Sequence, residues 1–206
     1  FKVDSLMPHQ RTHYLIESMR LAYWDRAQYL GDHDYIRVPV KKLLSNKHTK
    51  MLLSYISPDK ATPSSTLGRT PHAFADASPN TTHFSIIDTD GNMVSATLSI
   101  NFLFGSSFIA GNTGVLLNDE MDDFSIKPGV KNIFGLVGTK SNEIHPGKRP
   151  LSSMNPTFLI GKDRVAVLGT PGGSRIPTMV LLATLAFSEG KSPMTMVSLP
   201  RFHHQY

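Results

Sequence analysis

The chain has 206 residues, a net charge of +5 and 40% hydrophobic residues, a composition typical of a folded globular protein. Its 21 basic residues are scattered, which argues against nucleic-acid binding, and no apolar run reaches the roughly 20 residues needed to span a bilayer. The absence of cysteine excludes disulfides, a cysteine nucleophile and cysteine-bound metal within this chain.

The first part of the chain predicts two helices. Residues 9–30 carry apolar side chains at three-to-four spacing, with Arg20 and Asp25 on the opposite face. Residues 35–40 favour a short extended piece. Residues 41–56 show a second apolar stripe and predict another helix.

Residues 57–80 are rich in proline, serine and threonine and show no apolar period, which is typical of an exposed linker. They are either a simple connector or a flexible tail whose end can be cleaved. Thr81 follows directly. If the chain is cut before it, Thr81 gains a free α-amine beside its own hydroxyl, and so holds both a nucleophile and a base.

A β-hairpin is predicted next, with strands at residues 84–88 and 93–100 around an Asp-Gly turn. Alternation along the second strand places apolar side chains on one face and polar ones on the other. The polar row lies beside Thr81, where a site could form, and consists of Ser95, Thr97, Ser99 and Asn101.

Residues 118–124 pack four carboxylates into five positions. They lack the alternating acids and central glycine of a calcium loop, so we expect no metal there. The segment is either a solvated turn or a pocket wall that binds an ammonium group. Residues 127–141 contain several glycines around an apolar middle, which suits either a lid or a plain surface loop.

A second hairpin is predicted at residues 158–168, followed by a helix from residue 176 to about 187. Between them lie Gly172 and Gly173. Paired glycines that enter a helix present N–H groups to a negative oxygen, although a tight turn alone would also use them. The mixture of helices and antiparallel strands predicts a layered α/β protein.

Taken together, these segments resemble the γ-glutamyltranspeptidases (γ-glutamyltransferases) of the N-terminal-nucleophile hydrolase superfamily. The resemblance covers nearly the whole chain. Its motifs are Tyr29-Leu30-Gly31-Asp32, Thr81-Thr82-His83-Phe84-Ser85, Gly91-Asn92, Asn101, Phe104-Gly105-Ser106, and the stretches at residues 117–124, 148–154, 171–175 and 200–205.

The resemblance implies an αββα sandwich, incomplete in this chain because family precursors are longer at both ends. It also implies a precursor that cuts itself into a large and a small subunit. Residues 1–80 are then the end of the large subunit, with a flexible linker at 57–80, and residues 81–206 belong to the small subunit that pairs with it.

The resemblance also implies site roles. Thr81 is the nucleophile, Ser99 orients it, and the N–H groups of Gly172 and Gly173 hold the oxyanion. The substrate is glutathione or another γ-glutamyl compound. Its α-amine and α-carboxylate are bound by five further residues, namely Asn101, Glu120 and Asp123 for the amine and Ser152 and Ser153 for the carboxylate.

The family transfers the γ-glutamyl group to water or to amino acids and dipeptides, without metal or cofactor. Residues 128–139 align with its lid, where Phe134 replaces a tyrosine found in many bacterial members. The resemblance also implies a periplasmic or secreted protein, although the first residues lack a signal-peptide pattern. Two alternatives stay open: an inactive truncated member with a binding or structural role, and a relative acting on poly-γ-glutamate or glutaryl-type amides.

Overall fold

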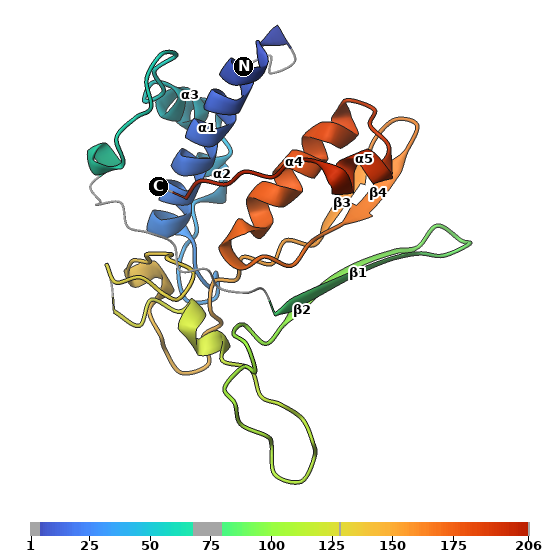
Figure 1. The fold of residues 1–206 in the computed structure, drawn as a ribbon. Coiled ribbons are helices and arrows are strands. Elements are labelled where there is room, and N and C mark those ends of the chain that lie inside the picture. Colours follow the sequence, from blue (N-terminus) through green and yellow to red (C-terminus); the bar gives the residue numbers. More distant parts are fainter. Residues whose placement is uncertain (1–4, 68–79, 128, 206) are drawn as a thin grey trace. The chain divides into compact units, whose positions relative to one another are not determined.

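The computed structural model describes residues 5–67, 80–127 and 129–205. These residues form two compact units, each built from segments that are distant in sequence (Figure 1). Unit 1 comprises residues 5–67, 124–127, 129–151 and 203–205, and unit 2 comprises residues 80–123 and 152–202. Unit 1 thus contains residues from before and after the predicted division at residue 80. That division concerns cleavage rather than packing, and it stays a prediction. No helix in these ranges is long and apolar enough to cross a bilayer.

The long helix of unit 1 is α1 (Pro8–Tyr29), which confirms the helix predicted at residues 9–30. Pro8 suits the first turn because it has no N–H to satisfy there. The side chain of Gln10 accepts the N–H of Met7, 3.2 Å away, and fixes the helix start. The unit's apolar core includes Met19, Tyr23 and Ala27 from one face of α1, together with Leu21 from the opposite side of the helix.

The polar face of α1 is buried as well, which the sequence pattern did not indicate. Arg20 is only 2% exposed and donates a hydrogen bond to Glu17. Asp25 Oδ2 lies 2.7 Å from Nε2 of the buried His48, which belongs to α3 (Asn46–Leu53) beside it (Figure 1). Removing one partner of a buried ion pair such as Glu17–Arg20 typically costs about 3–5 kcal/mol. The hydrogen bond between Asp25 and His48 joins α1 to α3.

The single helix predicted at residues 41–56 is wrong. The structure has two helices, α2 (Val40–Leu43) and α3. Ser45 separates them because its side chain accepts the N–H of His48 at 3.2 Å and caps α3. The extended piece predicted at residues 35–40 is also wrong, since this segment opens with a turn in which Tyr35 N–H bonds to Asp32 carbonyl O at 3.0 Å.

Most of residues 57–67 are exposed, as predicted for a linker, but the segment is attached to unit 1 at two points. The N–H and hydroxyl of Thr62 donate to the carboxylate of Glu17 at 3.3 and 2.6 Å. Leu67, at the end of the short 3₁₀ helix η2 (Ser64–Leu67), is 8% exposed. The buried carboxylate on α1 therefore holds this segment in place. The rest of the predicted linker, residues 68–79, lies outside the described residues.

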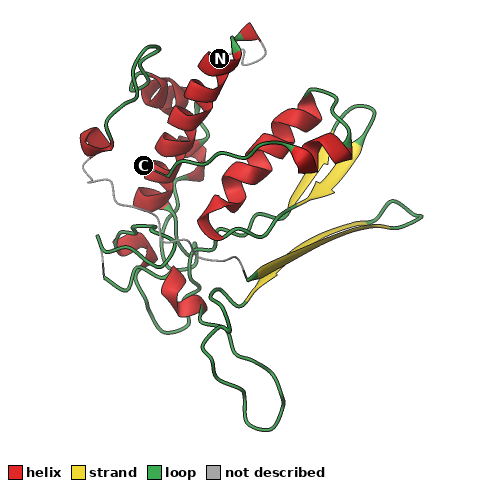
Figure 2. Cartoon of the chain, viewed as in Figure 1, coloured by secondary structure: helices red, strands yellow, loops and turns green. Residues whose placement is uncertain are grey.

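Apart from the short 3₁₀ helix η4 (Lys140–Asn142), loops form the remainder of unit 1 (Figure 2). The lid predicted at residues 128–139 is described from residue 129 onward. There, Asn132 Oδ1 accepts the N–H groups of Phe134 and Leu136, each at 3.0 Å. Gln205 Nε2 donates to the carbonyl O of Phe134 at 2.8 Å, so the end of the chain fastens this loop. A lid function stays a prediction.

Both predicted hairpins are present in unit 2. The first pairs β1 (Thr81–Ile87) with β2 (Met93–Ser99), and the second pairs β3 (Thr157–Ile160) with β4 (Val165–Leu168), both antiparallel. Asp88 closes the first hairpin by accepting the N–H of Asn92 at 2.8 Å and its side-chain amide at 2.7 Å. These bonds to Asn92 are the main reason that the pKa of Asp88 is lowered.

The predicted helix after the paired glycines is α4 (Ile176–Ser188), which packs against β3 and supplies the buried side chains of Ile176, Val180, Leu182 and Ala186 (Figure 1). A further helix, α5 (Pro193–Ser198), packs on α4 and was not anticipated. Ser192 caps it by accepting the N–H of Thr195 at 3.2 Å.

In the β1–β2 hairpin, the polar face is more buried than the apolar face. Its polar face, with Thr81, His83, Thr97 and Ser99, is half-buried. Its apolar face is more open, since Phe84 is 43% and Leu98 is 56% exposed. Contacts between β4 and both strands, including a 3.1 Å bond from Ser95 Oγ to the carbonyl O of Leu168, explain the covered polar side. The polar face is therefore where a site can lie.

Candidate active site

Thr81 is the first residue of β1 and pairs with Ser99, the last residue of β2. Thr81 Oγ1 lies 3.1 Å from Ser99 Oγ, and either hydroxyl can donate. Both side chains are half-buried. The β-ladder therefore fixes the predicted nucleophile beside the predicted orienting hydroxyl.

Asn101 continues this arrangement. Its N–H donates to Ser99 Oγ at 2.9 Å, and its side-chain amide donates to the carbonyl O of Asp119 at 3.3 Å. Asn101 is 4% exposed and has a positive φ of 68°, a conformation that asparagine tolerates better than most residues. Asn101 therefore links the end of β2 to the acidic turn.

The acidic turn is a short 3₁₀ helix, η3 (Glu120–Asp123), preceded by two side chains that fix its backbone. Asn118 Oδ1 accepts the N–H of Glu120 at 3.0 Å, and Asp119 Oδ1 accepts the N–H of Phe102 at 2.9 Å. Glu120 Oε1 is buried and has no hydrogen-bond partner among the described residues. A buried acceptor without a donor is costly, which makes this oxygen suited to an incoming cation or N–H group.

Gly172 and Gly173 lie between β4 and α4, in backbone conformations that other residues adopt only with strain. Gly172 has φ 144° and Gly173 has φ 56°. A Cβ on Gly172 would lie 2.3 Å from Cε of Met179. None of the loop and cap hydrogen bonds of the described residues uses either glycine's N–H as donor. Both N–H groups can therefore serve a ligand.

Ser152 and Ser153 lie in the extended segment before β3. Ser152 is exposed, and its Oγ accepts the N–H of Met154 at 3.0 Å. In the described part of the chain, no hydrogen bond joins Ser152 to Thr81, Ser99 or the acidic turn. The structure thus brings Thr81, Ser99, Asn101 and the acidic turn together through direct bonds, whereas the assigned roles of all nine candidate residues stay predictions.

Sequence reasoning gave no role to His83. The register places His83 on the same face as Thr81 and opposite Thr97, whose hydroxyl lies 2.8 Å from His83 Nδ1. His83 Nε2 lies 2.9 Å from Ser85 Oγ. The strand period of two could have found this row, because it places residues 81, 83 and 85 on one face.

Comparison with known proteins assigns the chain to a family. The family model described as "Gamma-glutamyltranspeptidase" matches residues 1–206. The chain belongs to this family. The resemblance carried by its sequence motifs is therefore confirmed.

Two relatives illustrate the match. A glutathione hydrolase proenzyme from Pseudomonas sp. (strain A14) is 48% identical over 202 residues, which are 96% of this chain and 34% of the relative. Another from Escherichia coli (strain K12) is 44% identical over 195 residues, 93% of this chain and 33% of the relative. The chain thus spans about a third of the length of these curated relatives.

Solved structures agree. γ-Glutamyltranspeptidase from Pseudomonas nitroreducens, complexed with L-DON, is 51% identical with a TM-score of 0.57 over 60% of this chain and 65% of its own. A mutant of the enzyme from Helicobacter pylori is 49% identical with a TM-score of 0.58 over 61% of this chain and 68% of its own. The predicted fold class is confirmed: the chain has an α/β fold of the N-terminal-nucleophile hydrolase type, of which it holds a part.

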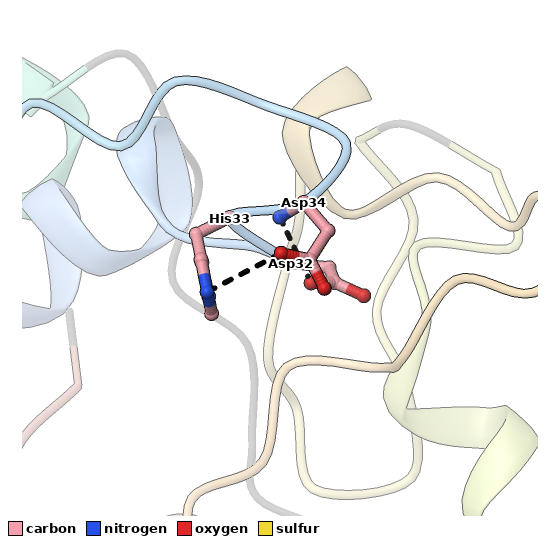
Figure 3. Close-up of side chains that lie close together, drawn as sticks. All are labelled: Asp32, His33 and Asp34. Atoms are coloured by element: carbon pink, nitrogen blue, oxygen red, sulfur yellow. Dashed lines mark hydrogen bonds and ion pairs between the residues drawn. The ribbon is translucent and has the colours of Figure 1, made fainter.

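A cluster that this γ-glutamyltranspeptidase chain carries in unit 1 looks at first like a metal site. Asp32, His33 and Asp34 each offer an atom within 4.8 Å of the others (Figure 3). Arg149, however, donates its backbone N–H and its guanidinium to Asp32 at 2.6–3.0 Å and also reaches Asp34. These hydrogen bonds hold the pKa of Asp32 far below its usual range. The cluster is therefore an arginine clamp that joins two loops of unit 1.

Proposed function

We propose that this chain is part of a self-processing γ-glutamyltransferase and hydrolase whose nucleophile is Thr81. The carrying observation is the series of contacts from Asn101 N–H to Ser99 Oγ at 2.9 Å and from Ser99 Oγ to Thr81 Oγ1 at 3.1 Å. It supports a hydroxyl held in one orientation at the start of a strand. The naming of relatives as proenzymes supports the processing step.

In the precursor, Thr81 Oγ attacks the carbonyl carbon of Asn80. The acyl group moves from the Thr81 nitrogen to its oxygen, and water hydrolyses the resulting ester. The products are a carboxylate on Asn80 and a free α-amine on Thr81. Residues 1–80 then end the large subunit, and the small subunit that pairs with it begins at Thr81.

In the mature enzyme, the α-amine of Thr81 takes the hydroxyl proton as Oγ attacks the γ-carbonyl carbon of the substrate. The C–N bond breaks, and the proton passes to the leaving amine. A γ-glutamyl ester on Thr81 remains. Water then releases glutamate, or the amine of an amino acid or dipeptide takes the γ-glutamyl group and forms a new amide.

The negative oxygen formed in each attack needs donors that are already in place. The N–H groups of Gly172 and Gly173 are proposed for this role, because they follow a strand, enter a helix and serve no loop or cap hydrogen bond among the described residues. Loss of one such donor typically raises the barrier by about 3–4 kcal/mol. The positive φ of both glycines supports a loop built to aim these groups.

Recognition of the substrate's free α-amine is proposed to determine which acyl group the enzyme accepts. Glu120 Oε1 is buried without a partner in the described chain, and Asp123 lies on the same 3₁₀ turn. Together with Asn101, these groups offer acceptors and negative charge to an ammonium. Ser152 and Ser153 are proposed to donate to the α-carboxylate. This chemistry fits glutathione and other γ-glutamyl compounds, and a periplasmic or secreted location is proposed with it.

The test uses the protein expressed from its complete coding sequence and the substrate L-glutamate γ-p-nitroanilide. We expect Thr81→Ala to lower kcat/KM at least about 10³-fold, as expected when a nucleophile is removed. Thr82→Ala is the matched control, because Thr82 is exposed on the opposite face of β1. Activity that survives Thr81→Ala would overturn the proposal. Faster turnover of poly-γ-glutamate or a glutaryl anilide would assign a different acyl group.

A further inference from the structure

The imidazole of His83 is fixed inside the β1–β2 hairpin. Thr97 Oγ1 lies 2.8 Å from Nδ1, and Ser85 Oγ lies 2.9 Å from Nε2. Hydroxyls donate or accept as required, so a neutral ring is satisfied at both nitrogens. Burial lowers the pKa of His83, which favours that neutral form at pH 7. The ring therefore has one orientation and little freedom to leave it.

Gly169 packs closely against the ring of His83. A Cβ built on Gly169 would lie 2.4 Å from both Cε1 and Nδ1 of His83 and 3.0 Å from Cγ. Real Cβ atoms essentially never come within 3.0 Å of another heavy atom. Gly169 must therefore be glycine because the ring occupies the space of a side chain, and the backbone of residue 169 rests directly on His83.

The contact between Gly169 and His83 joins the loop that carries Gly172 and Gly173 to the strand that begins with Thr81. Gly169 follows β4 and precedes Gly172 by three residues in the loop that carries the proposed oxyanion donors. His83 follows Thr81 by two residues on the same face of β1. Ser95 adds a parallel connection, since its Oγ accepts the N–H of Thr157 and donates to the carbonyl O of Leu168, each at 3.1 Å.

We propose that His83 is a positioning residue that sets the separation between the nucleophile strand and the glycine loop by packing its ring against Gly169. This inference rests on the proposed function. The ring does not touch the reacting atoms. The ring acts as a spacer of fixed thickness between β1 and the loop. Because protein interiors are close-packed, a change in side-chain volume at this contact shifts the strand or the loop. A misplacement of about 1 Å can cost about 10²-fold in rate.

The test is a double-mutant cycle on the protein expressed from its complete coding sequence, with L-glutamate γ-p-nitroanilide as substrate. Gly169→Ala inserts a methyl group against the ring. We expect kcat to fall at least about tenfold while KM changes less than about threefold, because alignment for reaction is lost and substrate contacts are kept. In the His83→Ala background the methyl group has room. There we expect Gly169→Ala to change kcat less than about threefold.

Thr97→Val gives a second reading in case His83→Ala does not fold. It keeps the ring but removes the hydroxyl bonded to Nδ1, and we expect kcat to fall about two- to tenfold, the value of one hydrogen bond. Thr82→Val, on the exposed opposite face, is the control and should match wild type.

The outcomes separate the two proposals. An equal loss from Gly169→Ala in both backgrounds, or equal kcat for Thr97→Val and Thr82→Val, would overturn the positioning role while the Thr81 mechanism stands. A wild-type protein without Thr81-dependent activity would overturn the proposed function and this inference with it.

Discussion

Thr81 Oγ1 and Ser99 Oγ lie 3.1 Å apart at the paired ends of β1 and β2. Ser99 Oγ also accepts the N–H of Asn101, so one of its lone pairs is engaged before it meets Thr81. A hydroxyl that accepts a hydrogen bond becomes a better donor through polarisation. In the proposed mechanism, Ser99 would both orient Thr81 and stabilise the charge that develops on Thr81 Oγ1.

Removing the Ser99 hydroxyl tests this relationship. We expect Ser99→Ala to slow both cleavage before Thr81 and turnover of L-glutamate γ-p-nitroanilide about two- to tenfold, because one hydrogen bond to Thr81 is lost. Ser99→Thr keeps the hydroxyl and should stay within about twofold of wild type. Gel analysis of the precursor and steady-state kinetics measure the two rates. Unchanged rates in Ser99→Ala would contradict an orienting role.

The buried oxygen of Glu120 leads to a prediction about substrate binding. Glu120→Gln keeps the shape but removes the charge that would face the substrate ammonium. We expect KM for the anilide to rise about 10- to 100-fold, as for a lost charged hydrogen bond, with a smaller change in kcat. Asp122→Asn is the matched control, since Asp122 lies on the same 3₁₀ turn, and its KM should stay near wild type. Similar KM values for both variants would show that Glu120 does not bind the substrate ammonium.

Gly172→Ala tests the glycine loop. Its φ of 144° is strained for any residue with a side chain, so the backbone must shift, and the end of the Met179 side chain, 2.3 Å from the added Cβ, must also move. We expect kcat to fall about 10²-fold or more because the oxyanion donors move. Gly190→Ala is the control, since Gly190 also has a positive φ, 78°, but no described atom outside its own neighbours lies within 4 Å of the position of an added Cβ. The control should lose about 1 kcal/mol of stability and keep its kcat. Equal kcat values in the two variants would argue against an oxyanion role.

The arginine clamp of unit 1 predicts a dependence of stability on pH. Arg149 lowers the pKa of Asp32, so the stabilising contribution of Asp32 is present above the unfolded pKa of about 3.9 and is lost as pH falls through the folded pKa. We expect Asp32→Asn to lower the melting temperature by several degrees at neutral pH. The gap from wild type should shrink below about pH 4. The exposed Asp59 gives the control variant Asp59→Asn, and a gap that does not change with pH would refute the clamp's role.

Several elements that depend on residues close together in sequence were predicted correctly. The Asp-Gly turn and alternating pattern gave the β1–β2 hairpin, and Asp88 does close it with bonds to Asn92. The helical period gave α1, and the helix predicted after the paired glycines is α4. The break at Ser45 was missed, because a serine inside an apolar stripe can cap a new helix as well as continue an old one.

Contacts between distant residues could not be read from the pattern. Glu17 and Arg20 look like solvated residues on a helix face, yet Glu17 is buried and binds Thr62, 45 positions further along the chain. The crowding of Gly169 by His83 also depends on how two hairpins meet. For the candidate site, the sequence indicated the residue types, and the structure adds the bonds that join Thr81, Ser99, Asn101 and the acidic turn.

The most direct test of the central claim is to identify the N-terminus of the mature small subunit and the residue that carries the acyl group. The wild-type protein, expressed from its complete coding sequence, would be incubated with L-glutamate γ-p-nitroanilide, quenched with acid, and analysed by N-terminal sequencing and peptide mass spectrometry. We expect a new N-terminus at Thr81 and one γ-glutamyl group on that residue, with neither in Thr81→Ala. An uncut protein that is active, or a γ-glutamyl group on another residue, would contradict the account.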